Sequence, residues 1–156
     1  MVSWTRDRIV KRIPSIATEM TPFPYSIDAG ADISDARGMM EEHDIQHLPV
    51  MENGALVGLL ADRDLRVARE LQRHVPQDGI TVGKVCNRAP YIVDMSERLD
   101  HVAFQMADRR VGAAVVVRQG KLAGILTTTD VCRLLAELLR ATAHVLGDDG
   151  DGGDAA

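Results

Sequence analysis

Apolar residues gather in short runs along this chain, and such runs are typical of buried strands. The strands that we expect around these apolar residues lie at 25–28, 48–51, 56–60, 91–94, 113–117 and 121–126. Two short polar dipeptides, Asn53-Gly54 and Gln119-Gly120, separate neighbouring runs and predict hairpin turns. The pattern therefore predicts three strands in each half of the chain.

Between and after these runs, apolar residues recur every three or four positions, which is typical of amphipathic helices. The first helix follows Asp32 or Ser34, either of which can cap it, and the second begins at Asp62 or Asp64. The last helix covers 128–145. The apolar stripes are, in chain order, Ile33, Ala36, Met39 and Met40; Leu65, Ala68 and Leu71; Leu99, Val102, Ala103 and Met106; and Val131, Leu134, Leu135, Leu138 and Leu139. We expect the stripes of the first and last helices to be buried.

The two halves are related by a shift of 66 residues, which aligns 15–70 with 81–136 without a gap. Ten aligned pairs are identical: Pro24/Pro90, Tyr25/Tyr91, Asp28/Asp94, Met40/Met106, Val50/Val116, Gly54/Gly120, Leu56/Leu122, Gly58/Gly124, Leu60/Leu126 and Asp64/Asp130. Because many of these identities fall on glycine, proline and aspartate, we interpret the chain as a duplication. One β-α-β-β-α unit cannot bury both faces of its sheet, so we expect an α/β (α+β) fold in which two units pack together.

The sequence around the repeats marks the domain organisation. We expect an N-terminal segment at 1–14, a first repeat at 15–73, a linker at 74–80, a second repeat at 81–146 and a disordered acidic tail at 147–156. The N-terminal segment has the spacing of a short amphipathic helix, ended by a proline, that docks on its own protein or on a partner.

Composition and charge narrow the class of protein. Apolar residues make up 46% of the chain and aromatic residues only 3%, so the core must be aliphatic. The net charge is −5, and the tail holds four aspartates, so the repeats are almost neutral and we expect no nucleic-acid partner. We expect no membrane partner and a cytoplasmic location, because no long apolar run or secretory segment is present. The two cysteines are too few for a disulfide framework.

The strongest candidates for ligand chemistry are the two turns in which a strand passes into a helix, 58–64 and 124–130. Both begin with glycine and end with aspartate, and the second also carries three threonines before Asp130. The first has Ala61 and Asp62 instead of hydroxyl groups. Because Ser, Thr and Asp are favoured helix caps, the alternative interpretation is that the second turn does nothing more than cap a helix.

Two further motifs accompany these turns: Glu19–Pro22 before the first strand and Ile45–Val50 at the entry to the hairpin. With them, residues 15–140 resemble the cystathionine-β-synthase (CBS) domain pair, or Bateman module, and we identify the chain as a stand-alone protein of this kind. The resemblance implies two units about a pseudo-twofold axis, with two clefts that bind AMP, ADP, ATP or S-adenosylmethionine. It also implies a homodimer of pairs and a regulatory role, with no required cofactor.

The resemblance further implies that each cleft takes a ribose-binding aspartate from one repeat and part of the adenine pocket from the other. The better site would consist of Met20, Tyr25, Ile45, Gly112, Ala113, Ile125, Thr127, Thr129 and Asp130. The weaker site would consist of Gln46, His47, Leu59, Arg63, Asp64, Cys86, Tyr91 and Val111. The weaker site lacks the hydroxyl and has an added carboxylate at Asp62, so we expect it to be empty, weak, or suited to a nucleoside with little phosphate charge or to a cationic adenosyl ligand.

The sequence predicts no catalytic and no metal site. The five histidines show no metal-ligand spacing, and no nucleophile motif or phosphate-binding loop is present. We therefore expect a regulatory module that binds an adenosine compound and passes a conformational change to an unknown regulated protein. The alternative is a structural module that binds no ligand and promotes oligomerisation. A nucleotide hydrolase is a third possibility, which lacks a recognisable acid and base.

Overall fold

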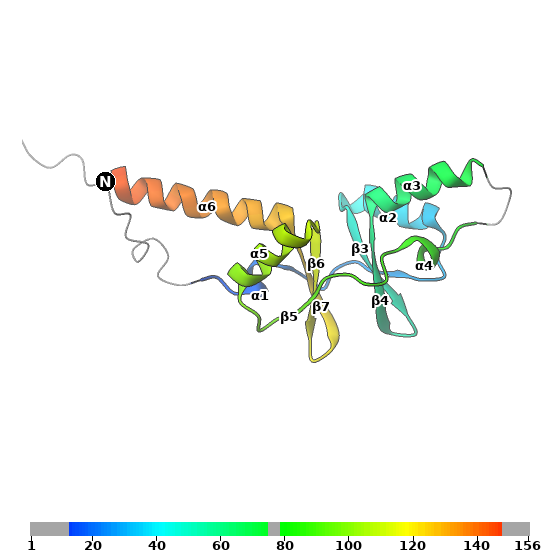
Figure 1. The fold of residues 1–156 in the computed structure, drawn as a ribbon, viewed down its shortest axis with the longest axis horizontal. Helices are drawn as coiled ribbons and strands as arrows, with labels where there is room; N and C mark the ends of the chain where they lie inside the picture. Colours follow the sequence, from blue (N-terminus) through cyan, green and yellow to red (C-terminus); the bar gives the residue numbers. More distant parts are fainter. Residues whose placement is uncertain (1–12, 75–78, 148–156) are drawn as a thin grey trace, which may run out of the picture.

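The structure, a computed structural model, describes residues 13–74 and 79–147 and contains two α/β units that lie side by side (Figure 1). Most of the expected N-terminal segment, the middle of the expected linker and nearly all of the expected tail lie outside the described residues. The elements are α1 (Ile16–Glu19), β1 (Thr21–Pro22), β2 (Ile27–Asp28), α2 (Ile33–His43), β3 (His47–Glu52), β4 (Ala55–Ala61), α3 (Asp62–Gln72), α4 (Val82–Val85), β5 (Ile92–Asp94), α5 (Leu99–Arg109), β6 (Ala113–Arg118), β7 (Lys121–Thr127) and α6 (Thr128–Gly147).

Each unit is built on one sheet, of strand order β2-β3-β4 in the first unit and β1-β7-β6-β5 in the second. In both, a parallel pair (β2 with β3, β5 with β6) continues into an antiparallel hairpin. The predicted turns at Asn53-Gly54 and Gln119-Gly120 close these hairpins, and all four residues have positive φ angles, as a tight hairpin turn requires. The duplicated β-α-β-β-α fold is thus confirmed.

The two units exchange short segments, which the sequence did not predict. Residues 15–22 begin the first sequence repeat, yet β1 pairs with β7, and Ile16 and Met20 lie in the core of the second unit. Residues 79–87 do the reverse: Val82 lies in the core of the first unit, and Asn87 exchanges two backbone hydrogen bonds of 2.9 Å with Leu59. The short helices α1 and α4 belong to these segments. Each sequence repeat is therefore completed by a piece of chain from the other.

The exchange explains the glycine that begins each candidate turn. A Cβ added at Gly58 would lie 2.8 Å from the backbone oxygen of Asn87, and one at Gly124 would lie 2.9 Å from that of Thr21. Gly124 also lies directly against the Met20 side chain. Both glycines have ordinary φ angles, so they are needed for space and not for backbone conformation. They let the exchanged segment cross close to the strand that leads into each turn.

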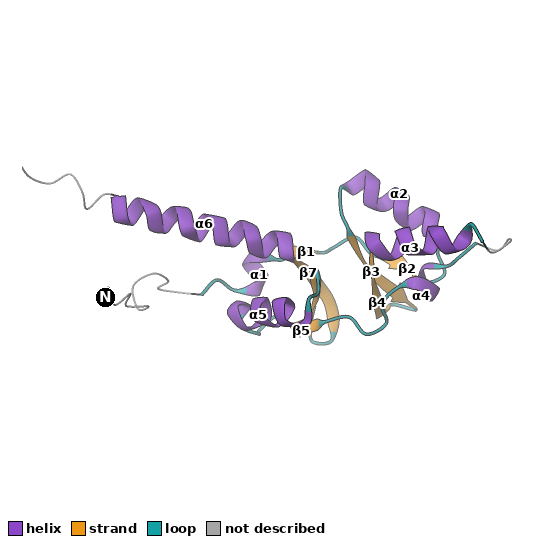
Figure 2. Cartoon of the chain, turned by 45° about the horizontal axis from the view of Figure 1, so that its top comes forward, coloured by secondary structure: helices purple, strands orange, loops and turns teal. Residues whose placement is uncertain are grey.

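The sheets face each other in the middle of the molecule, and the helices lie on their outer sides (Figure 2). A small apolar cluster joins the two sheets, formed by Leu59 of β4, Ala113 and Val115 of β6, and Ile125 of β7. A separate aliphatic core lies within each unit. The contact between the sheets brings the end of β4 and the end of β7, where the two turns begin, close to the opposite unit.

The long helix α6 differs from expectation, because its apolar stripe is not buried as a whole. Leu135 is 54% exposed and Leu139 is 61% exposed, and only Val131, Leu134 and Leu138 are partly covered. The second half of α6 extends beyond the sheet of its unit, so no element of the described chain covers it (Figure 1). Within the ranges that the structure describes, no helix is long and apolar enough to cross a membrane.

Two smaller differences concern individual positions. Leu71, placed on the apolar stripe of the second helix, is 60% exposed near the end of α3. Tyr25 and Tyr91, placed at the start of the first strand of each repeat, precede the strands β2 and β5.

The starts of two helices agree with the sequence. Asp32 is the cap of α2, and its carboxylate accepts a hydrogen bond of 2.8 Å from the Ser34 N–H. Helix α3 begins at Asp62, one of the two predicted starts.

Candidate functional site: two clefts between the units

Two clefts lie between the units, and we name them after the aspartates of their turns. The Asp64 cleft has a volume of about 360 Å³ and is lined by Gln46, His47, Leu59, Ala61, Asp62, Arg63, Asp64, Arg66, Asn87, Pro90, Tyr91, Arg110, Val111, Gly112 and Ala113. The Asp130 cleft has a volume of about 480 Å³ and is lined by Thr21, Pro24, Tyr25, Asp44, Ile45, Gln46, His47, Gly112, Ile125, Thr127, Thr128, Thr129, Asp130 and Arg133. Both volumes are typical of small-molecule sites.

Each cleft combines a turn from one unit with a wall from the other. The Asp64 cleft uses the end of β4 and the start of α3, closed by Tyr91 and by 110–113. The Asp130 cleft uses the end of β7 and the start of α6, closed by Tyr25 and by 44–47. A ligand in either cleft would therefore contact both repeats, which is the reciprocal arrangement that the resemblance implies.

The Asp130 turn is held by a reciprocal set of hydrogen bonds. The Thr127 N–H and the Thr127 hydroxyl both donate to Asp130 Oδ2, at 2.8 Å each, and the Asp130 N–H donates to Thr127 Oγ1 at 3.2 Å. This is a capping box at the start of α6. The other carboxylate oxygen, Oδ1, faces Arg133 Nη1 at 3.5 Å. The turn therefore does cap the helix, as the alternative interpretation proposed, and it also lines a cleft.

The Asp64 turn has half of this network. The Ala61 N–H donates to Asp64 Oδ2 at 2.9 Å, but Ala61 has no hydroxyl to complete the capping box. Asp64 Oδ1 makes no hydrogen bond to any part of the chain that the structure describes. Asp62 pairs with Arg66 at 2.7 Å, so the added carboxylate of this turn is neutralised by its own helix.

His47 lies at the boundary of the two clefts and lines both. A Cβ added at Gly112 would lie 3.2 Å from His47 Nε2, so the absence of a side chain at Gly112 leaves room for the imidazole. Burial lowers the pKa of His47 below the ordinary value of 6.5; nearby Asp64 raises it and Arg63 lowers it. The neutral imidazole is therefore favoured in the folded protein.

The two tyrosines that close the clefts are held by different neighbours. The Tyr25 ring stacks on the His43 ring, with 3.7 Å between ring centroids and 10° between planes. The Arg109 guanidinium lies 4.3 Å from the centre of the Tyr91 ring, in a cation–π contact. Tyr25 thus packs against the end of α2 and Tyr91 against the end of α5. Each ring provides a flat surface beside its cleft.

Most residues predicted for the two sites line the clefts, with three corrections. Met20 is only 9% exposed and lies in the core of the second unit, because the exchanged segment carries it under Gly124. Ala113 lines the Asp64 cleft and not the Asp130 cleft, because its strand β6 faces β4. Cys86 packs against the core of the first unit and does not line the Asp64 cleft.

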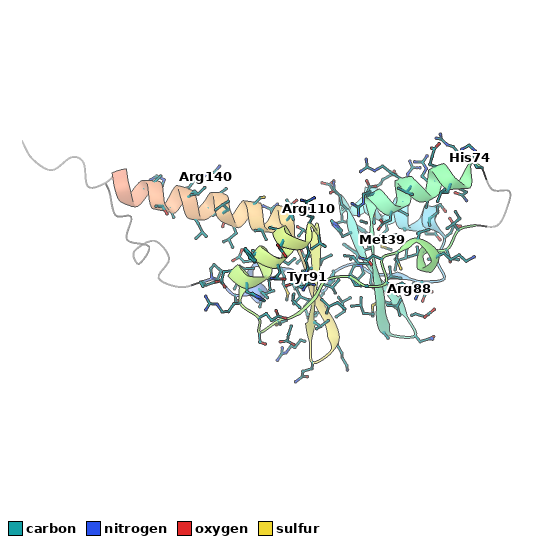
Figure 3. The ribbon with its side chains drawn as sticks, viewed as in Figure 1. Met39, His74, Arg88, Tyr91, Arg110 and Arg140 are labelled. Atoms are coloured by element: carbon teal, nitrogen blue, oxygen red, sulfur yellow. The ribbon has the colours of Figure 1, made fainter. Side chains whose placement is uncertain are left out.

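Sequence reasoning missed the charged groups at the cleft rims. Arg66 and Arg110 line the Asp64 cleft, and Asp44 and Arg133 line the Asp130 cleft. Arg110 lies on the side of the second unit that faces the first, as does Tyr91 (Figure 3). The 66-residue shift pairs Asp44 with Arg110, and this inversion of charge at equivalent positions is the signal that could have found them.

The groups that line the clefts are of kinds that recognise small molecules. Within 13–74 and 79–147, no group of three or more His, Cys, Asp or Glu side chains could hold a metal ion. Cys86 is half-buried, and burial raises the pKa of its thiol, which disfavours the reactive thiolate. What the clefts present is a carboxylate, a helix N-terminus and an aromatic side chain, a set suited to binding a polar ring compound.

Comparison with known proteins relates both repeats to one domain family. The model of the CBS domain matches residues 10–70 and 82–137. Among curated proteins, the L-aspartate semialdehyde sulfurtransferase of Methanocaldococcus jannaschii is 29% identical over 113 residues, which cover 71% of this chain and 21% of that protein. The chain thus spans about a fifth of the length of this relative.

Two similar solved structures contain adenosine compounds. The CBS domain pair of protein MJ0100, in complex with 5′-methylthioadenosine and S-adenosyl-L-methionine, has 25% identity and a TM-score of 0.72, over 81% of this chain and 98% of that chain. The protein CBSX2 of Arabidopsis thaliana, in complex with AMP, has 28% identity and a TM-score of 0.69, over 80% of this chain and 97% of that chain.

Proposed function

The chain belongs to the CBS-domain family, and from this premise we propose that it is a cytoplasmic regulatory protein that binds adenosine compounds in the Asp64 and Asp130 clefts. The observation that carries the proposal is that each cleft joins an aspartate turn of one unit to a tyrosine-bearing wall of the other. Adenosine compounds are bound by two similar CBS pairs, as AMP in one and as methylthioadenosine and S-adenosylmethionine in the other.

In each cleft, one oxygen of the aspartate holds the turn and the other can hold the ligand. Oδ2 of Asp64 and of Asp130 accepts backbone hydrogen bonds inside the turn. Within the described ranges, Oδ1 of Asp130 has only the long contact to Arg133, and Oδ1 of Asp64 has no partner. A ribose has two neighbouring hydroxyl donors, which a carboxylate oxygen accepts well.

Regulation follows from the position of the clefts between the units. A ligand that contacts both repeats favours one packing of the two sheets, and it shifts the population toward that packing if its affinity for the two states differs. The joint between the sheets is the small apolar cluster of Leu59, Ala113, Val115 and Ile125, which a modest rotation can rearrange. The regulated protein would read this change on the outer helices.

Calorimetric titration with AMP, ATP and S-adenosylmethionine tests the proposal. We expect heat and a rise in melting temperature with at least one ligand, and loss of both in the double variant Asp64→Asn/Asp130→Asn. Asparagine keeps an oxygen that can accept the turn's N–H, so folding is preserved while the charge is lost. The absence of heat and thermal shift with all three ligands would contradict the proposal and favour a ligand-free module.

Oligomerisation has its own supporting observation. Phe104 on α5 is 67% exposed, and Leu135 and Leu139 on α6 are more than half exposed, so the outer helices of the second unit carry uncovered apolar side chains. We propose that these helices pair with a second copy in a homodimer. Light scattering on the parent and on Leu135→Glu/Leu139→Glu measures this: a dimer that becomes a monomer supports the pairing, and an unchanged mass contradicts it.

We propose that the clefts do not catalyse a reaction. The carboxylates of Asp62, Asp64 and Asp130 are engaged in caps and ion pairs, and within the described parts of the chain no hydrogen bond joins a lining carboxylate to His47. Incubation with ATP and Mg²⁺ should release no phosphate above the blank. Turnover that disappears in Asp130→Asn would contradict this and would assign a hydrolase.

A further inference from the structure

Two equivalent positions of the repeats carry opposite charges at the rims of the two clefts. Asp44 follows α2 and Arg110 follows α5, and both have left-handed backbone conformations, with φ of 51° and 55°. Asp44 lines the Asp130 cleft and Arg110 lines the Asp64 cleft. Because the backbone is the same at both positions, the two side chains leave the helix end in corresponding directions, and the pair inverts the charge of one cleft relative to the other.

The Asp64 cleft carries an excess of positive charge. Three guanidinium groups line it, from Arg63, Arg66 and Arg110, against the two carboxylates of Asp62 and Asp64. Arg66 is paired with Asp62, whereas Arg63 and Arg110 form no ion pair with the described residues. These two arginines come from opposite units, so they approach the cleft from both sides. A guanidinium group fits two phosphate oxygens at once and is a preferred phosphate ligand.

The Asp130 cleft has the opposite balance. Two carboxylates, Asp44 and Asp130, line it against one guanidinium group, Arg133, which lies near Asp130 Oδ1. The Thr127 hydroxyl, which would be a donor for phosphate, already donates to Asp130 Oδ2. The remaining carboxylate at the rim, Asp44, repels an anionic ligand and attracts a cationic one.

We infer that the two clefts select adenosine compounds of opposite charge: a 5′-phosphorylated adenosine in the Asp64 cleft, and a neutral or cationic adenosyl compound in the Asp130 cleft. The inference rests on the proposed function and adds the class of ligand for each cleft, with Arg110 and Asp44 as the specificity-determining residues. The inference reverses the expectation that Ala61 and Asp62 make the Asp64 cleft unfavourable for phosphate. Asp62 is paired with Arg66, and Arg110 comes from the opposite unit, so the sequence of the turn does not contain it.

AMP and adenosine separate the phosphate from the rest of the ligand, because they differ by this group only. The measurement is made in Asp130→Asn, where the Asp64 cleft alone keeps its aspartate. We expect AMP to bind more tightly than adenosine, and Arg110→Gln to weaken AMP about tenfold to a hundredfold while it leaves adenosine unchanged. Arg118→Gln, at an exposed arginine of β6 that lines neither cleft, is the matched control and should change neither ligand.

S-adenosylmethionine tests the other cleft, in the variant Asp64→Asn. We expect it to bind there and Asp44→Asn to weaken it about two- to fivefold, as for an exposed charge pair. Asparagine tolerates the left-handed conformation of this position, so the change is one of charge. AMP should bind more weakly to this variant than to Asp130→Asn.

The outcomes separate the inference from the proposed function. If AMP binds and its advantage over adenosine survives Arg110→Gln, or if AMP prefers the Asp130 cleft, the charge assignment is overturned while adenosine binding stands. If AMP, adenosine and S-adenosylmethionine all fail to bind the parent protein, both the inference and the proposed function are overturned.

Discussion

The Asp64 and Asp130 clefts share a backbone frame and differ in the groups that it presents. Both aspartates accept the N–H of the residue three positions before them, and both clefts are closed by a tyrosine from the opposite unit. The capping hydroxyl is present only at Thr127, and the rim charge is inverted between Asp44 and Arg110. The comparison teaches that the duplication repeats the frame of a cleft, whereas a few exposed side chains give each cleft its own charge; on our proposal, that charge selects the ligand.

Exchange of the rim charges is the change with the largest expected effect. In the double variant Asp44→Arg/Arg110→Asp, AMP affinity of the Asp64 cleft should fall about a hundredfold, because an attractive group is replaced by a repulsive one. The Asp130 cleft should gain affinity for AMP. Titration of this variant in the Asp64→Asn and Asp130→Asn backgrounds measures both effects. Equal AMP affinity of the double variant and the parent protein would show that rim charge does not set the difference between the two clefts.

The glycines at the two turns test what the clefts have in common. Gly58→Ala and Gly124→Ala should each lower the free energy of unfolding by about 1–3 kcal/mol, because the added Cβ meets the backbone of the exchanged segment. Urea denaturation measures the change. Gly38→Ala is the control: it lies in α2 with nothing within 4 Å of an added Cβ, and it should stabilise by up to about 1 kcal/mol. An unchanged free energy of unfolding in both variants would contradict the close contact between these glycines and the exchanged segments.

The capping hydroxyl tests how the two turns differ in stability. Thr127→Ala should cost about 1 kcal/mol, because the Asp130 N–H loses its acceptor and Asp130 Oδ2 loses a donor. Ala61→Thr should stabilise the first turn by a smaller amount, because it supplies the missing half of the capping box. Thermal unfolding measures both variants. If Ala61→Thr destabilises the protein, the first turn cannot form the capping box that Thr127 forms in the second.

The pH dependence at His47 is the smallest expected effect. Since burial lowers the pKa of this imidazole in the folded state, the unfolded chain binds the proton more readily, and stability should fall as the pH drops below 6.5. His47→Gln should flatten this part of the profile. Chemical denaturation between pH 5 and pH 8 gives the comparison, and a parent profile that His47→Gln leaves intact would assign the effect to another group.

Much of the fold could be predicted from the sequence because its signals are local or repeat at one spacing. A glycine after a polar residue indicates the hairpin turns at 53–54 and 119–120, and short apolar stretches indicate the strands. The candidate site was accessible for the same reason, since the turns 58–64 and 124–130 are contiguous in sequence. Two of the errors concern exchanged segments, because Met20 lies in the core of the second unit and Cys86 packs against the core of the first; the third, Ala113, depends on which cleft its strand faces.

The sequence by itself determined the duplicated main helices and hairpins and the two aspartate turns, because these depend on spacing within a few residues. Only the tertiary structure decided which segments the units exchange, why Gly58 and Gly124 must lack a side chain, and that Arg110 and Asp44 face the opposite unit's turns. The physical reason is that these contacts join residues far apart in the chain. The charge of a cleft is the sum over both of its walls, and no single stretch of sequence contains both.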